Sequence, residues 1–169
     1  MLKLLIKRMM RLKNTLRRRL HMICWNLHYG KQFKAKKFHF RDNFRIYIEE
    51  NGQLQIGEKC FFNNNCSVTV RKKITIGANC IFGENVSIYD HNHCYSETDK
   101  LISKQGFQSD EVVIEDDCWI ATNVTILKGV HVGRHSVIGT GVILYKDVPA
   151  NSVIVCKQEL RKVNKKYDI

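Results

Sequence analysis

The hydrophobic positions of this chain recur at a spacing of six residues over most of its length. From Ile56 the blocks read IGEKCF, FNNNCS and VTVRKK, and from Ile76 they read IGANCI and FGENVS. After a polar interruption the spacing resumes at Ile114 with IEDDCW, IATNVT, ILKGVH, VGRHSV, IGTGVI and LYKDVP. In each block the first residue is apolar and the second is often glycine, and the fifth is small in every block except VTVRKK, where it is Lys72. Internal repeats of this kind predict a solenoid whose repeats are stable only when they stack.

A spacing of six fits neither an α-helix nor a simple strand alternation. It predicts a mainly β coil with three flat faces, and about four such coils stacked at the usual strand spacing. The large first residue and the small fifth residue point inward, and glycine tolerates corner geometry that a side chain would resist. A strand-like alternation from Phe44 to Ile48 ends at the turn dipeptide Asn51-Gly52, so we place the coil domain at residues 42–156. Parallel crossovers are right-handed in most folds, and no feature of these blocks reverses that expectation.

The first 28 residues contain neither glycine nor proline and predict an amphipathic helix. Its apolar residues recur at helical spacing, at Leu5, Met9, Leu12, Leu16, Leu20, Ile23 and Leu27. Two roles stay open for this face: it packs on the solenoid or a neighbouring subunit, or it lies on an anionic membrane surface. Residues 31–41 continue basic and aromatic, and we assign them to a connector.

The net charge of +12 belongs almost entirely to this N-terminal arm. Residues 1–41 hold 13 of the 28 Lys and Arg residues and no acid, which leaves 15 bases against 16 acids in the rest. Because the body is close to neutral, nucleic acid is not the expected partner. The first 20 residues alternate apolar and basic too finely for a signal peptide. We therefore expect a cytoplasmic protein, with peripheral contact at the inner face of the cell membrane if residues 1–28 take the second of the two roles given above.

The seven cysteines do not form a metal or disulfide pattern, because their number is odd and no CxxC pair is present. Four of them occupy the small fifth position of a block, where other blocks place valine: Cys60, Cys66, Cys80 and Cys118. At that position cysteine acts as a small hydrophobic residue. Reduced thiols agree with a cytosolic compartment.

Two motifs flank the polar interruption at residues 89–111: NVSI begins at Asn85, and WIATNVTI begins at Trp119. Together with the six-residue blocks, they resemble the hexapeptide-repeat acyltransferases, and most closely the sugar O-acetyltransferases of the galactoside, maltose and capsule or lipopolysaccharide type. The resemblance covers about residues 44–155. It implies a left-handed parallel β-helix with an extruded loop, acetyl-CoA as co-substrate, and a homotrimer in which neighbouring subunits share each active site.

In that family the reactive histidine follows the first motif by five positions, which gives His93 here. The chemistry agrees, because acyl transfer from a thioester to a hydroxyl needs a base, and imidazole has an unperturbed pKa of about 6.5. We expect direct transfer with His93 as base, its second ring nitrogen held by Asp90 or a backbone carbonyl. A backbone N–H near the coil after Trp119 would stabilise the oxyanion. His91 is the alternative base, since alternation along an extended loop places both imidazoles on one side.

The resemblance also suggests how acetyl-CoA would bind. It places Trp119 beside the acceptor and acyl group. It places pantetheine against the backbone at the small residues Ala121, Thr122, Gly139 and Thr140. Lys146 occupies a basic position of the family, and the tail at 157–169 adds three cations for the phosphates, Lys157, Arg161 and Lys162. The chain departs from the family at Ala121, where glycine is common, and after Cys156, where the closing G-x-P-[AC]-[KR] pattern is absent.

The expected acceptor is a small-molecule or lipid-linked sugar hydroxyl in surface polysaccharide or glycan biosynthesis. Loop side chains that can hydrogen-bond a polyol include Asn85, Asp90, Tyr95 and Asp99. Loops of this kind carry specificity, so the sequence leaves the sugar itself open.

Two other functions compete with acetyl transfer. One is a non-catalytic scaffold, in which the loop only docks a partner. The other is zinc hydration, because γ-type carbonic anhydrases share this scaffold; they need three histidines from facing coils, whereas His131 and His135 both occupy corners. The cluster of Asp90, His91, His93 and Cys94 is too tightly bunched to surround one ion, so no metal is expected.

Overall fold

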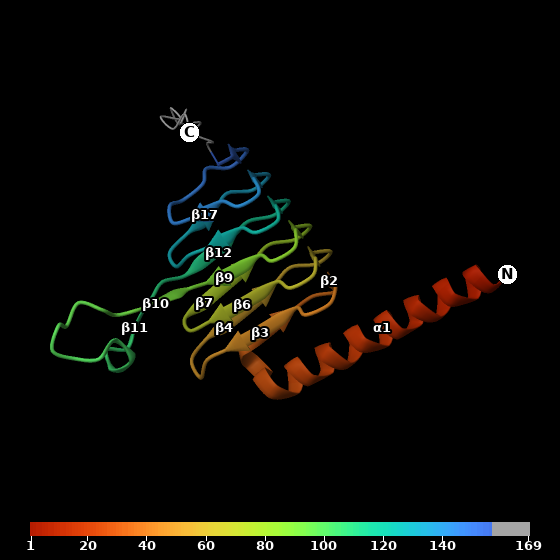
Figure 1. Cartoon of the computed structure of the whole chain (residues 1–169), viewed down its shortest axis with the longest axis horizontal. Helices are drawn as coiled ribbons and strands as arrows, with labels where there is room; N and C mark the ends of the chain where they lie inside the picture. Colours follow the sequence, from red (N-terminus) through yellow and green to blue (C-terminus); the bar gives the residue numbers. More distant parts are fainter. Residues whose placement is uncertain (157–169) are drawn as a thin grey trace, which may run out of the picture.

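The structure, a computed structural model, describes residues 1–156 and shows one long helix followed by a three-sided parallel solenoid (Figure 1). Wall A consists of β1 (Phe33–Ala35), β4 (Gln53–Ile56), β7 (Lys73–Ile76), β12 (Val112–Ile114) and β15 (His131–Val132). Wall B consists of β2 (His39–Phe40), β5 (Phe61–Phe62), β8 (Ile81–Phe82), β13 (Trp119–Ile120), β16 (Val137–Ile138) and β18 (Val153–Ile154). Wall C consists of β3 (Arg45–Ile48), β6 (Ser67–Val70), β9 (Ser87–Tyr89), β14 (Thr125–Ile126) and β17 (Ile143–Leu144).

Neighbouring strands within the three walls pair in parallel, and successive strands along the chain pass from wall to wall, so the predicted mainly β solenoid is confirmed. The number of coils differs from the prediction, because wall B alone contains six strands. Residues 33–40, which we assigned to a connector, form β1 and β2 and pair with β4 and β5. The first coil was missed because its buried residues depart from the six-residue spacing: Phe33, Phe38, Phe40 and Phe44.

The inward positions of the blocks form one continuous apolar core, as predicted. Phe62 and Phe82 stack with ring centroids 4.2 Å apart, and Ile120 and Ile138 continue the column above them. The four cysteines at the fifth position are buried and free of disulfides. The thiol of Cys60, for example, lies 3.0 Å from the carbonyl oxygen of Gly77 in the next coil. These cysteines therefore fill the core, as the sequence indicated.

The corners use glycine differently from the prediction. The residues with positive φ are mostly the fourth of each block, such as Asn65 (φ 61°) and Asn123 (φ 60°), and asparagine tolerates this left-handed region. Glycine at the second position instead allows coils to approach. A Cβ on Gly77 would lie 2.7 Å from the backbone nitrogen of Asp116, and one on Gly57 would lie 2.5 Å from the backbone of Gly77.

The helix α1 (Leu2–Tyr29), followed by the short helix η1 (Gly30–Gln32), covers the end of the first coil (Figure 1). The Trp25 ring lies 5.2 Å from Phe40 and 5.7 Å from Phe44, and the Tyr29 hydroxyl donates to the carbonyl of Ile46 at 3.0 Å. The N-terminal half of α1 projects beyond the solenoid. Within residues 1–156, no helix is long and apolar enough to cross a membrane.

The apolar face that the sequence predicted is not the face that packs on the solenoid. Met22, Trp25 and Tyr29 contact the first coil, whereas the predicted stripe is exposed. The exposed stripe consists of Leu5, Met9, Leu12, Leu16, Leu20, Ile23 and Leu27. A helix has about 3.6 residues per turn, so these two sets lie on different sides of α1. The stripe therefore has no partner within the described part of this chain.

Candidate active site

The polar interruption forms a loop that protrudes from the solenoid between walls C and A (Figure 1). It contains β10 (His91–His93), a turn of helix η2 (Ile102–Lys104) and β11 (Phe107–Ser109). β10 and β11 are antiparallel, and their register pairs His93 with Phe107. Both predicted imidazoles therefore lie on a paired strand at the base of the loop.

Asp90 fixes the start of this strand. Its carboxylate is fully buried and accepts backbone N–H groups from Arg71 at 2.8 Å and Lys72 at 2.7 Å. The Nδ1 of His91 lies 2.9 Å from the same carboxylate, where its N–H can donate. A buried carboxylate needs such donors, and here the backbone and one imidazole supply them. Asp90 thus contacts His91, whereas from the sequence we gave it as one of two possible partners of His93, the other being a backbone carbonyl.

His93 is exposed, and its ring lies 4.2 Å from the ring of Phe107. No residue in the range 1–156 forms a hydrogen bond with its ring nitrogens. The guanidinium of Arg71 lies 3.3 Å from the centre of the Phe107 ring and pairs with Glu49 at 3.2 Å. Arg71 therefore ties the loop to the solenoid through Phe107. Arg71 and Phe107 were not among the residues predicted from the sequence, because their contact depends on the register of the loop.

A hollow of about 410 Å³ lies on the outer surface of wall C, and its rim ends at Tyr89, next to the histidine strand. Hydroxyl groups line most of it, from Tyr47, Ser67, Thr69, Ser87 and Tyr89, together with Arg45 and Asn65. The Tyr89 and His91 rings are 6.4 Å apart. Every second side chain of an extended segment points to the same side. The hydroxyls of Ser87 and Tyr89 on β9 are therefore followed on that side by the imidazoles of β10.

Asn85, predicted to bind the acceptor, lies in a ladder of asparagines at the corner between walls B and C. Its side chain accepts from Asn65 at 3.2 Å and donates to Asn123 at 2.9 Å. Asn43 extends the ladder by donating to Asn65 at 3.0 Å. These contacts satisfy the Asn85 amide along the solenoid. Tyr95, the other predicted acceptor residue, is exposed on the loop.

The residues predicted to contact pantetheine meet at the corner that follows wall B. Thr122 follows β13, and Gly139 and Thr140 follow the paired strand β16. The backbone N–H of Gly141 donates to the carbonyl of Thr122 at 3.0 Å, which holds the two turns together. Ala121 is buried in the first of these turns.

The remaining predicted cofactor residues lie elsewhere. Trp119 is 53% exposed on wall B, in register with Ile81 and Val137. The loop with the two histidines leaves the solenoid after wall C. Within one chain, Trp119 therefore lies on a different wall from this loop. Lys146 follows β17 of wall C and lies over the ring of Tyr145, at another corner. Arg161, Lys157 and Lys162 lie outside the described residues.

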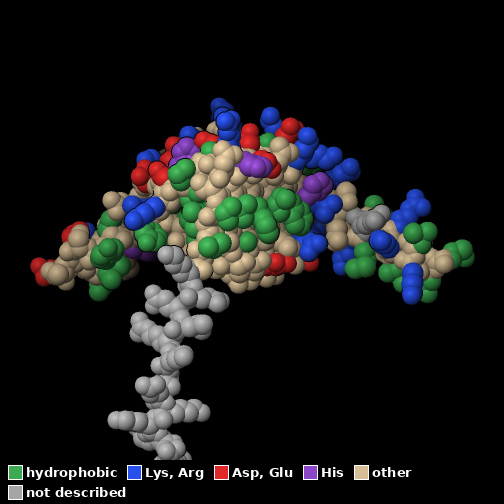
Figure 2. Space-filling view, turned by 90° about the horizontal axis from the view of Figure 1, so that it is seen from above, with side chains coloured by type: hydrophobic (Ala, Val, Ile, Leu, Met, Phe, Trp, Pro, Cys, Tyr) green, Lys and Arg blue, Asp and Glu red, His purple; other side chains and the backbone are tan. Residues whose placement is uncertain are grey.

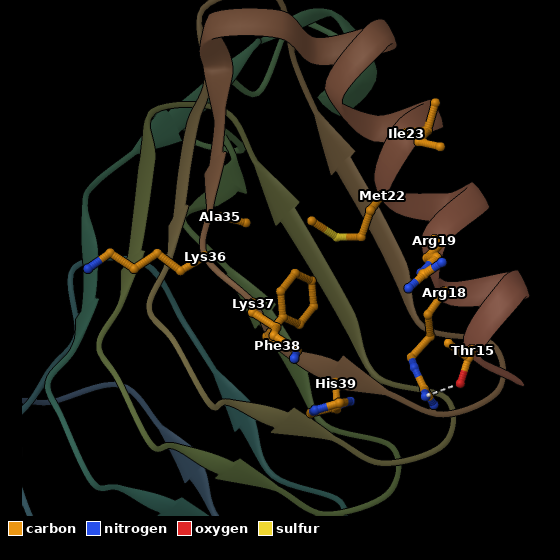
Figure 3. A pocket seen from close by; sticks show the side chains of 10 residues that line it. All are labelled: Thr15, Arg18, Arg19, Met22, Ile23, Ala35, Lys36, Lys37, Phe38 and His39. Atoms are coloured by element: carbon orange, nitrogen blue, oxygen red, sulfur yellow. Dashed lines mark hydrogen bonds between the residues drawn. The ribbon is translucent and has the colours of Figure 1, made fainter. Parts of the chain in front are cut away.

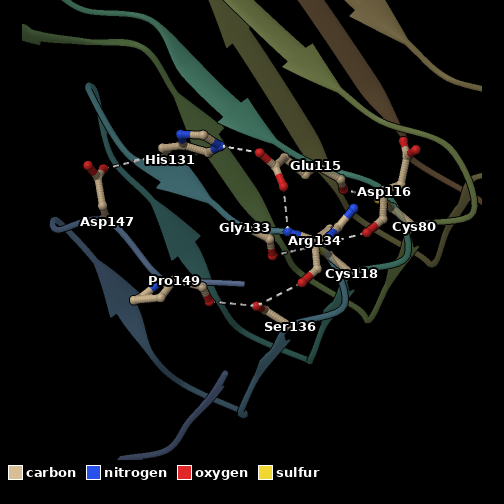
Figure 4. Close-up of polar contacts among 10 residues, drawn as sticks. All are labelled: Cys80, Glu115, Asp116, Cys118, His131, Gly133, Arg134, Ser136, Asp147 and Pro149. Atoms are coloured by element: carbon tan, nitrogen blue, oxygen red, sulfur yellow. Dashed lines mark hydrogen bonds and ion pairs between the residues drawn. The ribbon is translucent and has the colours of Figure 1, made fainter. Parts of the chain in front are cut away.

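The histidines of the zinc alternative have carboxylate partners. The Nε2 of His131 lies 2.9 Å from Glu115, whose other oxygen accepts the backbone N–H of Arg134 (Figure 4). His135 pairs with Asp117 at 2.8 Å. Residues 1–156 contain no group of three or more His, Cys, Asp or Glu that could hold a metal ion.

Comparison with known proteins gives consistent similarities. The family profile described as bacterial transferase hexapeptide (six repeats) matches residues 111–146. The chain is 33% identical to a putative acetyltransferase of Saccharomyces cerevisiae, over 74% of this chain and 66% of the relative. It is 34% identical to the galactoside O-acetyltransferase of Lactococcus lactis, over 59% of this chain and 47% of the relative.

A crystal structure of a hexapeptide-repeat-containing acetyltransferase from Vibrio cholerae, complexed with acetyl-CoA, superposes with a TM-score of 0.61. The sequences are 26% identical, and the match covers 72% of this chain and 64% of that chain. The chain spans about half to two thirds of the length of the first curated relatives that it matches. From its repeats, its solenoid and these similarities, we conclude that the chain belongs to the hexapeptide-repeat acetyltransferase family.

Proposed function

We propose that this protein transfers an acetyl group from acetyl-CoA to a sugar hydroxyl. The observation that carries this proposal is the pair of imidazoles on an anchored strand beside a hollow lined with hydroxyl groups. The galactoside O-acetyltransferase of Lactococcus lactis and the acetyl-CoA complex from Vibrio cholerae support the reaction class.

The hollow on wall C suits a polyol acceptor. Serine and threonine hydroxyls can each donate and accept a hydrogen bond, as a sugar hydroxyl does. Tyr47 and Tyr89 add two aromatic rings, which can cover the apolar face of a sugar ring while their hydroxyls bond its polar edge. Arg45 adds a cation, which would favour a sugar that carries a carboxylate or phosphate.

His93 is the proposed general base. Its ring nitrogens are unoccupied by other residues of the described chain, and its contact with Phe107 restricts the ring. As the acceptor oxygen bonds to the thioester carbon, His93 would take the hydroxyl proton. The C–S bond then breaks, and the leaving thiolate takes the proton back from the imidazolium. A backbone N–H of a neighbouring subunit, at the turn that follows its Trp119, would stabilise the oxyanion between these steps.

The contact between Asp90 and His91 favours a second candidate base. Asp90 would hold Nδ1 of His91 protonated, which leaves Nε2 free to accept a proton. The His91 side chain is 14% exposed, compared with the open position of His93. We therefore assign His91 to anchoring β10 and His93 to proton transfer.

A homotrimer would bring the remaining site residues together. Trp119 and the small residues of the wall B corner lie on one wall of the chain, and the histidine loop leaves from the junction of the other two. If wall B of a neighbouring subunit faced this loop, Trp119 of the partner could cover the acyl group. The exposed apolar row of Ile81, Trp119 and Val153 on wall B would be covered in the same contact.

Turnover of acetyl-CoA tests the proposed reaction and separates it from the scaffold alternative. We expect the purified full chain to acetylate at least one member of a panel of neutral and acidic sugars, detected as a mass increase of one acetyl group. Trp119→Ala should raise KM for acetyl-CoA more than it lowers kcat, because it removes a binding surface and no proton donor or acceptor. A chain that binds sugars without turnover across the panel would favour the scaffold.

We also propose that α1 lies on an anionic membrane surface and keeps the enzyme near lipid-linked sugar acceptors at the inner face of the cell membrane. Its exposed stripe has basic residues beside it, and Figure 2 shows green and blue side chains along the projecting arm at the right. Residues 1–41 contain no acid that would oppose this contact. Apolar burial and attraction to anionic lipids together stabilise such interfacial helices.

Removing three apolar side chains of the projecting half tests the membrane contact. Replacing Leu5, Met9 and Leu12 together with glutamine should weaken partitioning onto anionic vesicles at least about a hundredfold, because each loses apolar burial in the interface. Co-sedimentation with vesicles measures this partitioning. The substitutions lie outside the packed half of α1, so thermal unfolding should not change. Equal sedimentation of the variant and the native chain would contradict the contact.

A further inference from the structure

The junction between α1 and the first coil forms a groove of about 610 Å³ that the proposed acetyl transfer does not use (Figure 3). Met22 points into the groove from the helix, and Phe38 points into it from the opposite segment (Figure 3). These two side chains and Ala35 give the groove an apolar floor.

The rim of the groove is basic. Arg18 and Arg19 of α1 face Lys37 and His39 of the first coil across it. No acidic side chain is among the residues that line it. The nearby acid Asp42 forms an ion pair with Arg17 of α1, and neither of these two residues lines the groove. The groove therefore combines an apolar floor with uncompensated positive charge.

This combination fits an amphiphile with an anionic head. Arginine and lysine bind phosphate through charge-assisted hydrogen bonds, and the apolar floor matches the first carbons of an acyl chain. A free sugar phosphate would not cover the apolar floor formed by Met22, Ala35 and Phe38. A second copy of this arm would bring like charges together, since residues 1–41 contain 13 bases and no acid.

The groove is also continuous with the surface that we propose to face the membrane. Ile23 belongs both to the exposed stripe of α1 and to the lining of the groove. A bilayer in contact with the stripe would present its headgroups at the mouth of the groove. Resting on the proposed membrane contact, we infer that the groove binds the phosphate of one acidic phospholipid per chain, with acyl carbons against Met22 and Phe38.

A matched pair of double variants of the full chain tests this site. Arg18→Gln with Lys37→Gln removes two charges from the groove, and Lys3→Gln with Lys7→Gln removes two charges from the projecting half of α1. We expect the groove variant to lose about tenfold more affinity than the control for vesicles of equimolar phosphatidylcholine and phosphatidylglycerol, because it also loses a specific site. Equal losses in the two variants would overturn the site, because general attraction to the surface would then explain binding.

Soluble probes separate a lipid site from a site for any anion. Calorimetry should show saturable binding of one dihexanoyl-phosphatidylglycerol per chain, lost in the groove variant and kept in the control. Dihexanoyl-phosphatidylcholine should not bind. Inorganic phosphate binding as tightly as the short-chain lipid, or no saturable lipid binding, would overturn the inference. Acetylation of a soluble sugar should be unchanged in both variants, so failure of lipid binding is distinguishable from failure of the proposed reaction.

Discussion

Replacing His93 with alanine should lower kcat for sugar acetylation by about 10²–10⁴-fold, the usual contribution of a positioned general base. The ring is exposed, and its only ring contact within residues 1–156 is with Phe107, so the substitution should leave the solenoid intact. Mass spectrometry of the acetylated sugar measures the rate without interference from the exposed thiols of Cys24 and Cys156. KM for the acceptor should change much less than kcat, because the proton transfer occurs in the transition state.

Two other histidine variants make this result specific. His135→Ala removes an exposed imidazole that pairs with Asp117 at a corner, and it should leave kcat unchanged. His91→Asn keeps an N–H donor near the position of Nδ1, so it should retain the contact with Asp90 and most of the activity. A kcat that falls with His91→Asn and survives His93→Ala would transfer the role of base to His91.

The sequence predicted the interior of the solenoid well, because almost every six-residue block places the same two positions, the first and the fifth, in the core. Large residues such as Ile76 and Ile138 are buried where the blocks place them, and Cys118 fills a small inward position. Burial raises the pKa of the Cys66 thiol to about 11, as expected for a thiol that packs in a core. The first coil was not predicted, because its buried phenylalanines do not follow the six-residue spacing. Their positions are determined by packing against α1 and not by a repeated block.

The candidate site was predicted only as far as local sequence determines it. The motif that begins at Asn85 pointed to His93, and alternation along an extended loop predicted that His91 lies on the same side. The partner of Asp90 was not determined, because Asp90 precedes both imidazoles and the course of the backbone decides which of them its carboxylate meets. Arg71 precedes the loop by a full coil, so its contact with Phe107 appears only when the coils are stacked. The position of Trp119 relative to the histidine loop was likewise not predicted, because the stacking of the coils decides on which wall Trp119 lies.

The helix shows how periodicity can identify an element and still assign its faces incompletely. The stripe from Leu5 to Leu27 is the strongest apolar periodicity in the arm, yet the packed face consists of Met22, Trp25 and Tyr29. Trp25 and Tyr29 are aromatic residues four positions apart, so they lie on the same side of the helix and together bury a large area. These few residues are enough to hold the arm on the first coil. The longer stripe is then left available for a partner beyond the described residues of the chain.

Aromatic stacking joins the irregular first coil to the regular repeats. The ring of Phe62 lies 4.2 Å from Phe82 above it and 4.5 Å from Phe44 below it, with interplanar angles of 7° and 24°. Phe38 contacts the same ring at 5.8 Å. Because each coil of a solenoid is stabilised mainly by its neighbours, the loss of one shared ring weakens the interfaces on both of its sides.

Phe62→Ala should therefore lower the free energy of unfolding by about 3–5 kcal/mol, the cost of removing a buried phenylalanine where the surroundings cannot collapse. Its neighbour on β5 provides the control, because Phe61 points outward, is only partly buried, and has the guanidinium of Arg41 5.5 Å from the centre of its ring. Phe61→Ala should cost no more than about 1 kcal/mol. Urea unfolding of both full-length variants, followed by circular dichroism, measures the difference. Equal losses of unfolding free energy in the two variants would show that the stack of buried aromatic rings does not couple the first coil to the repeats.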